Sequence, residues 1–239
     1  FAVWWHDILE KESTRRSIDT MKATGANYFG LAPFWYQDNK TAVTIFRRPD
    51  KTATDSSVRR AFQYAKSVGL KVALKPMVDS RDGTWRGQLA PVSVDAWFQS
   101  YKEFILNYAR IAQEERIDYF IIGTEFASLT KPQYSGKWRE IIREVRAVYS
   151  GPVTYAANWG KRNEGEYYQI DFWDALDAIG IDAYFPLSET NTPTVQSVAS
   201  AWTAINSGGT QNWFQDIKAR HDRFNKPVIL TEIGYLSCD

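Results

Sequence analysis

The feature that most constrains this chain is an alternation between short apolar runs and longer segments of helical period. Seven apolar runs are predicted as strands: residues 2–5, 27–32, 71–75, 118–122, 153–156, 178–181 and 227–230. Their apolar character is continuous rather than alternating, which is typical of parallel strands buried on both faces. The segments between them carry apolar residues at helical spacing, as Trp97, Tyr101, Phe104 and Tyr108 do.

Strands that alternate with helices form a parallel sheet, which either closes into a (β/α)₈ barrel or stays open and doubly wound. The barrel is favoured because no Gly-x-Gly-x-x-Gly follows the first strand and polar residues follow many different strands. The length of 239 residues is close to the roughly 250 of a plain barrel. We therefore expect an α/β fold, a TIM (β/α)₈-type barrel, with a single domain over residues 1–239.

Composition narrows the class of partner. A net charge of +1 with 24% charged residues gives no basic patch for nucleic acid and no attraction to an anionic membrane. No apolar run reaches the roughly 18 residues of a membrane span. Aromatic residues make up 15% of the chain, and many lie beside Asp, Asn, Gln or Gly, which suits a sugar-binding cleft. Two histidines are too few for a histidine-based metal cluster, so we expect no metal and no cofactor.

Cysteine and glycosylation signals bear on the compartment. Cys238 is the single cysteine, so the chain forms no internal disulfide and the redox compartment stays open. Asn39-Lys40-Thr41 matches the N-glycosylation acceptor pattern and slightly favours a secreted protein. The oligomeric state cannot be inferred from the sequence.

Two glutamates end apolar strands in the same manner. Glu125 closes residues 119–125 and Glu232 closes residues 227–232, each directly after a threonine. The C-terminal ends of barrel strands hold the active sites of such enzymes, and the fourth and seventh strands face each other across the barrel mouth. A pair of carboxyls, one protonated and one ionised, is what glycosidic bond hydrolysis needs. The alternative is that each glutamate caps a helix or forms an ion pair at a strand exit.

Segments spread over nearly the whole chain resemble one known family. They are residues 25–27 (Gly-Ala-Asn), 34–37 (Phe-Trp-Tyr-Gln), 69–76 (Gly-Leu-Lys-Val-Ala-Leu-Lys-Pro), 78–79 (Val-Asp), 84–87 (Thr-Trp-Arg-Gly), 123–125 (Gly-Thr-Glu), 155–159 (Tyr-Ala-Ala-Asn-Trp), 180–186 (Gly-Ile-Asp-Ala-Tyr-Phe-Pro) and 231–235 (Thr-Glu-Ile-Gly-Tyr). Through them the chain resembles glycoside hydrolase family 113, the β-mannanases. These belong to a clan of retaining barrel enzymes with catalytic glutamates after strands four and seven.

The resemblance implies that Glu125 is the acid/base and Glu232 the nucleophile. It further implies endo-acting hydrolysis of β-1,4-mannan or manno-oligosaccharides by double displacement through a glycosyl-enzyme intermediate. The partner is then a β-linked oligo- or polysaccharide. Two alternatives stay open: a glycosidase acting on another β-glycan, and a non-catalytic carbohydrate-binding barrel.

Five matched aromatic and amide residues are candidates for binding roles. Tyr184 looks like the tyrosine that hydrogen-bonds the nucleophile in the clan, and its alternative is a core tyrosine near a strand end. Asn158 and Trp159, after the fifth strand, are candidates for a sugar hydroxyl contact and a stacking face. Trp35 and Tyr36, after the second strand, either line an outer subsite or pack over the barrel rim.

Charged candidates complete the predicted site. Lys75 ends a strand, and because a buried lysine must be paired, its candidate partners are the active-site carboxylates or a sugar hydroxyl. Asp79, Trp85 and Arg86 lie in the loop that follows, which is rich in groups that bind polyols. Asp182 either hydrogen-bonds substrate or anchors a loop.

Two departures from the family pattern change the expectations. Many members of the wider clan carry Asn directly before the acid, where it contacts the sugar 2-hydroxyl, but this chain has Thr124. The contact to the 2-hydroxyl is therefore unassigned. Residues 233–239 leave no room for strand eight, and part of strand one is also missing from the expected pattern. We therefore expect an open barrel with unpaired strand edges and an apolar flank.

Overall fold

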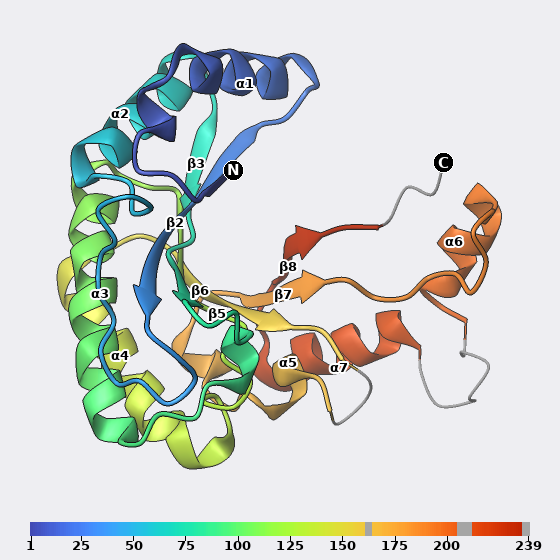
Figure 1. The fold of residues 1–239 in the computed structure, drawn as a ribbon. Coiled ribbons are helices and arrows are strands. Elements are labelled where there is room, and N and C mark those ends of the chain that lie inside the picture. The colour runs from blue at the N-terminus through green and yellow to red at the C-terminus, as the bar shows by residue number, and fades with distance from the viewer. Residues whose placement is uncertain (161–163, 205–211, 236–239) are drawn as a thin grey trace.

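The computed structural model describes residues 1–160, 164–204 and 212–235. Its centre is a curved parallel sheet of strands β1 (Ala2–Val3), β2 (Tyr28–Gln37), β3 (Lys71–Leu74), β4 (Met77–Ser80), β5 (Tyr119–Thr124), β6 (Val153–Asn158), β7 (Ile179–Ala183) and β8 (Val228–Ile233). The strand order is β1-β2-β3-β5-β6-β7-β8. The predicted parallel sheet of a (β/α)₈-type barrel is confirmed (Figure 1).

Strands β3 and β4 pair end to end with one long strand, β2. Tyr28–Leu31 of β2 align with β3, and Phe34–Gln37 align with β4. The two short strands therefore occupy a single barrel position, so β5 and β8 are the fourth and seventh barrel strands. Within the described ranges no pairing joins β8 to β1, and the sheet stays open (Figure 1).

The helices are α1 (Glu12–Ala23), α2 (Asp55–Ser67), α3 (Val94–Glu114), α4 (Ser135–Val148), α5 (Glu166–Gln169), α6 (Val195–Ala201) and α7 (Trp213–Phe224), with 3₁₀ turns η1 (Ile8–Glu10), η2 (Arg86–Gln88), η3 (Pro132–Tyr134) and η4 (Trp173–Ala175). Most of them cover the outer side of the sheet, whereas α6 lies apart from it, beyond the end of β7 (Figure 1). None of the described helices is both long and apolar enough to cross a membrane.

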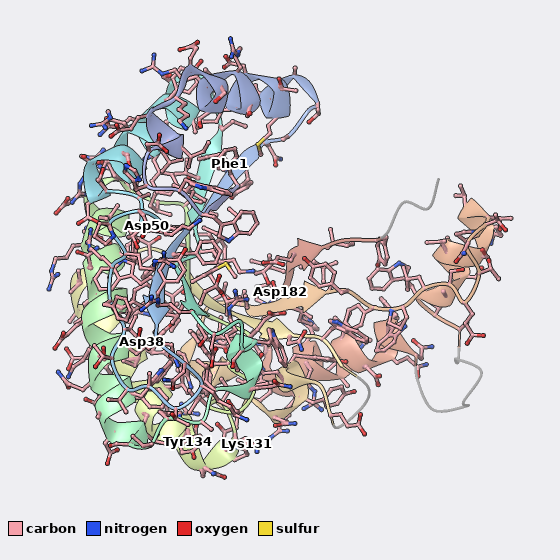
Figure 2. The ribbon with its side chains drawn as sticks, in the orientation of Figure 1. Phe1, Asp38, Asp50, Lys131, Tyr134 and Asp182 are labelled. Carbon is pink, nitrogen blue, oxygen red and sulfur yellow. The ribbon has the colours of Figure 1, made fainter. Side chains whose placement is uncertain are left out.

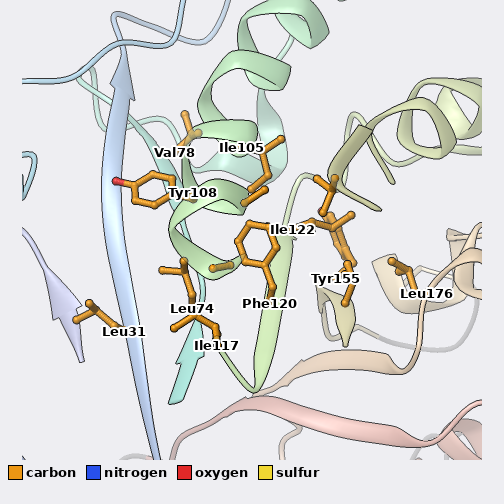
Figure 3. Packing of buried hydrophobic residues seen from close by; sticks show 14 of the residues in the cluster. Leu31, Leu74, Val78, Ile105, Tyr108, Ile117, Phe120, Ile122, Tyr155 and Leu176 are labelled. Atoms are coloured by element: carbon orange, nitrogen blue, oxygen red, sulfur yellow. The ribbon is translucent and has the colours of Figure 1, made fainter. Parts of the chain in front are cut away.

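The main core lies between the strands and these helices. Phe120 and Ile122 of β5 gather with Ile105 and Tyr108 of α3, all fully buried (Figure 3). Each large apolar side chain buried in this way stabilises the fold by about 1.5–3 kcal/mol. Tyr101 also joins α3 to β5 by a hydrogen bond, in which its hydroxyl donates to the Ile122 carbonyl at 2.7 Å. The core thus fixes the strands whose ends carry the candidate residues.

Several strands run further toward their C-terminal ends than their apolar runs indicate. The largest difference is at β2, where the prediction ends at residue 32 and the strand continues to Gln37. Trp35 and Tyr36 therefore lie within a strand rather than after it. Asp79 lies in β4 rather than in a loop, because the Met77–Ser80 backbone pairs with β2.

Candidate active site

Glu232 of β8 is held at both carboxylate oxygens. The Lys75 ammonium donates to Oε1 at 2.5 Å, and the Tyr184 hydroxyl donates to Oε2 at 2.6 Å. Burial acts to raise the pKa of Glu232, but Lys75, Tyr184 and Arg86 outweigh burial and lower it. The carboxylate is therefore ionised at neutral pH, as a nucleophile must be. Both partners were sequence candidates, and Lys75 has the carboxylate partner that its burial required.

Asp182 lies behind this pair on β7, at the inner side of the sheet (Figure 2). Its oxygens accept from Lys75 at 2.8 and 3.0 Å, and Oδ1 also accepts from the Thr231 hydroxyl at 2.7 Å. Burial raises the pKa of Asp182 to about 6, aided by the Glu232 charge and opposed by Lys75. Asp182 is completely buried, which favours an anchoring role over the predicted contact with substrate. Asp182 anchors Lys75.

Glu125 follows β5 in a left-handed backbone conformation, with φ of 53°. Such a conformation costs a residue other than glycine on the order of 1–3 kcal/mol and is concentrated at functional sites. Its Oε2 accepts from the Trp85 indole at 3.1 Å and from Arg86 at 3.2 Å. Arg86 also donates to Asp79 at 2.6 Å. The loop candidates thus converge on Glu125, as a cluster that orients one carboxyl.

A cavity of about 580 Å³ extends along the inner face of the sheet, from Gly30, Ala73 and Ile121 within the strands toward the C-terminal strand ends. Five sequence candidates line it: Lys75, Asp79, Arg86, Tyr184 and Glu232. Glu125 joins this group through its bond with Arg86. The cavity is large enough for sugar units of an oligosaccharide chain.

Its apolar wall was not predicted. Trp4, Phe34 and Met77 line the cavity, and the Trp4 ring lies 5.8 Å from the Phe34 ring. Trp4 follows β1 directly and is 49% exposed. The signal that could have found it is an aromatic residue at a strand exit, but the predicted first strand extended through Trp5 and placed Trp4 inside it.

Trp35 and Tyr36 do not line the cavity. The Trp35 indole donates to the Tyr108 hydroxyl at 3.1 Å, and its ring packs edge-on against Phe104 of α3. Successive strand residues face opposite sides of a sheet, so with Phe34 facing the cavity Trp35 faces the helices. Tyr36 is buried in a small cluster with Phe34 and Met77. The structure therefore favours the packing interpretation for both residues.

Asn158 and Trp159 also lie away from the cavity lining. The Trp159 ring contacts the rings of Phe185 and Trp213 edge-on, in the core. The backbone N–H of Asn158 donates to Glu166 Oε2 at 2.7 Å. An aromatic residue beside polar neighbours does not reveal which side of the sheet it faces, and this is why the sequence prediction placed Trp159 at the sugar.

Thr124 does not supply the missing contact to the sugar 2-hydroxyl. It is completely buried, and its hydroxyl has no partner within the described part of the chain. In that same part, no group of three or more His, Cys, Asp or Glu side chains could hold a metal ion. The charged side chains that line the cavity are Lys75, Asp79, Arg86 and Glu232.

Comparisons with known proteins identify the family. The profile of Glycoside Hydrolase Family 113 matches residues 5–239. One similar solved structure is a GH113 β-1,4-mannanase complex, 27% identical, with a TM-score of 0.82 over 98% of this chain and 71% of that chain. Another is the GH113 β-mannanase from Alicyclobacillus acidocaldarius, 28% identical, with a TM-score of 0.83 over 97% of this chain and 68% of that chain.

A more distant structure shares the fold alone. The endo-1,4-β-mannanase from Rhizomucor miehei is 14% identical and has a TM-score of 0.58, over 98% of this chain and 78% of that chain. The search of curated proteins gives no match. Since the family profile matches nearly the whole length, and the barrel sheet carries a carboxyl at the end of both β5 and β8, this chain belongs to Glycoside Hydrolase Family 113 and is a glycoside hydrolase.

Proposed function

We propose that this protein is an endo-acting hydrolase of β-1,4-linked mannan or manno-oligosaccharides. It cleaves internal glycosidic bonds with retention of anomeric configuration. The observation that carries the proposal is the ionised Glu232 carboxylate, held by Lys75 and Tyr184 in the wall of the cavity. The two solved relatives above are described as β-1,4-mannanase and β-mannanase, and this description supports the choice of polymer.

In the first step Glu232 attacks the anomeric carbon and forms an ester, while the glycosidic C–O bond breaks. Glu125 gives its proton to the departing oxygen. Oε2 of Glu125 already accepts from Trp85 and Arg86, whereas Oε1 has no hydrogen-bond partner within the described residues. We therefore assign the transferred proton to Oε1, the oxygen that is free to face the leaving group.

The ester then removes the negative charge of Glu232. Lys75 keeps one anionic partner at this stage, because Asp182 holds its ammonium through both carboxylate oxygens. Lys75 therefore stays in place for the second step. In that step Glu125 takes a proton from water, the water oxygen attacks the anomeric carbon, and the ester bond breaks to restore ionised Glu232.

The test is release of reducing ends from β-mannan, cellulose and xylan, with the anomer formed first identified by NMR. We expect mannan cleavage giving the β-anomer first, with loss of activity in both Glu125→Gln and Glu232→Gln. Cleavage of another glycan alone would overturn the mannan assignment and leave the mechanism standing. First release of the α-anomer would overturn retention. Folded protein without activity on any glycan would support a carbohydrate-binding barrel.

A further inference from the structure

A buried carboxyl outside the catalytic steps lies close to Glu125. Glu166, the first residue of α5, is 2% exposed. Its Oε1 accepts from the Tyr155 hydroxyl at 2.6 Å and the Thr130 hydroxyl at 2.8 Å, and its Oε2 accepts from the backbone N–H of Asn158 at 2.7 Å. Glu166 thus joins the loop after β5, the middle of β6 and the end of β6.

The network reaches the peptide that follows Glu125. The Phe126 amide donates to the Tyr155 hydroxyl at 2.8 Å, and the Thr130 hydroxyl lies 3.3 Å from the Phe126 carbonyl. On the other side, the Glu125 amide donates to the Ala156 carbonyl at 2.9 Å. Both peptide groups that flank Glu125 are therefore fixed, one by the β6 backbone and the other by Tyr155. These two peptides set the left-handed φ and the ψ of Glu125.

The Tyr155 ring can take this place because residue 123 is glycine. A Cβ at Gly123 would lie 2.5 Å from the Tyr155 ring and 2.9 Å from Trp138. The glycine two residues before Glu125 therefore opens room for the ring whose hydroxyl supports it. Tyr155 is completely buried, so its hydroxyl depends on Glu166 as its acceptor.

Position 166 favours a carboxyl. The backbone N–H of Asn158 can only donate, whereas the Tyr155 and Thr130 hydroxyls can donate or accept. A glutamine whose oxygen faced the Asn158 N–H would turn its NH₂ group toward the two hydroxyls, and the Tyr155 hydroxyl, which already accepts from the Phe126 N–H, would lose the acceptor for its own proton. Burial raises the pKa of Glu166 to about 8 against these hydrogen bonds, and the nearby charge of Glu125 acts in the same direction as burial.

We infer that Glu166 is a positioning residue for the acid/base. Through Tyr155 and Thr130 it fixes the Glu125–Phe126 peptide and so aims the Glu125 carboxyl at the scissile oxygen. The inference rests on the proposed function, since it presupposes that Glu125 transfers the proton. Misplacement of a catalytic group by about 1 Å reduces the rate up to about 100-fold, so a Glu166→Gln variant loses rate wherever proton transfer is needed.

The experiment separates proton transfer from general damage by changing the leaving group. A manno-oligosaccharide leaves as a poor alkoxide and needs the acid, whereas 2,4-dinitrophenolate leaves without it. We would measure kcat/KM on mannopentaose and on 2,4-dinitrophenyl β-mannobioside for Glu166→Gln and Tyr155→Phe. The expected result is a loss of about 10-fold to 100-fold on the oligosaccharide and nearly unchanged kcat/KM on the dinitrophenyl substrate. Azide, which needs no base, is expected to restore kcat on the latter.

Controls make each outcome decisive. Thr154→Val removes another buried hydroxyl from β6, one that donates to the Ala178 carbonyl, and should change both substrates equally. Equal losses on both substrates in Glu166→Gln, or no loss, would overturn the inference. If Glu166→Gln does not fold, Thr130→Val removes one arm of the network and must show the same leaving-group dependence. If Glu125→Gln itself lacks that dependence, the proposed role of Glu125 fails instead.

Discussion

Replacing Lys75 by methionine isolates the charge that keeps Glu232 ionised. The ammonium lies 2.5 Å from Glu232 and 2.8 Å from Asp182, and the Lys75 side chain is only 9% exposed. Methionine keeps most of the apolar stem and removes the charge. The two carboxylates then lack the cation between them, so the pKa of Glu232 must rise. The acid limb of the kcat/KM profile moves to higher pH as a result.

The size of the shift follows from one charge-assisted hydrogen bond, which contributes about 1.5–3 kcal/mol. A third of the Glu232 side chain is exposed, so solvent screening favours the lower end of that range. At 1.36 kcal/mol per pH unit, about 1.5 kcal/mol moves the acid limb upward by about one unit. The pKa of Glu232 must move upward, because a nearby cation lowers the pKa of a carboxyl and its removal reverses that effect.

The Lys75→Met variant also loses stability, and this loss arises at Asp182, whose side chain is completely buried. Removing the partner of a buried charge costs about 3–5 kcal/mol of unfolding free energy. The double variant Lys75→Met/Asp182→Asn removes the unpaired charge and should recover part of that cost while keeping the shifted acid limb. Urea unfolding and pH–rate profiles measure the two quantities. An acid limb unchanged in both variants would refute the argument that Lys75 sets the ionisation of Glu232.

Three further predictions concern Glu232 and the network of Tyr155 and Glu166. Tyr184→Phe removes a hydrogen bond to Glu232 of 2.6 Å and should lower kcat/KM about tenfold, with thermal unfolding nearly unchanged because Tyr184 is 41% exposed. Gly123→Ala forces a methyl against the Tyr155 ring and should cost about 1–3 kcal/mol in urea unfolding; a midpoint equal to that of the wild type would contradict the packing. Burial raises the pKa of Glu166 from 4.5 to about 8, so this group disfavours the folded state increasingly as pH rises from about 4.5 through 8. The difference in unfolding free energy between Glu166→Gln and the wild type should therefore shift in favour of the variant over that interval, and a constant difference would contradict it.

The sequence predicted those parts of the fold in which the local residue pattern directly reflects burial in the folded protein. Buried parallel strands are apolar throughout, so their presence and order could be inferred, and so could the stripe of α3. Strand ends could not be inferred in the same way. β2 runs to Gln37 because its pairing with β4 continues after the apolar run has ended, and pairing between strands distant along the chain leaves no local signal.

The candidate site also contains residues that the sequence could predict and residues that it could not. Glu125, Glu232 and Lys75 could be identified because a charged residue at the end of a buried strand must be either paired or placed for function. No comparable pattern marks Glu166, whose side-chain donors Tyr155 and Thr130 lie 11 and 36 residues away. The sequence also does not show which side of the sheet an aromatic residue faces: Trp35 packs on α3, whereas Trp4 lines the cavity.

Each of the two carboxyls that we propose as catalytic is supported by a second, buried one. Asp182 holds Lys75 against Glu232, and Glu166 holds the peptide after Glu125 through Tyr155. Burial raises the pKa of both supporting carboxyls, so each costs the fold stability at neutral or alkaline pH. Groups that destabilise the folded state are expected in an active site, because preorganised charges and a fixed backbone reduce the structural reorganisation that the reaction requires. The cost therefore falls at the elements that orient Glu125 and Glu232, and not in the apolar core between the sheet and its helices.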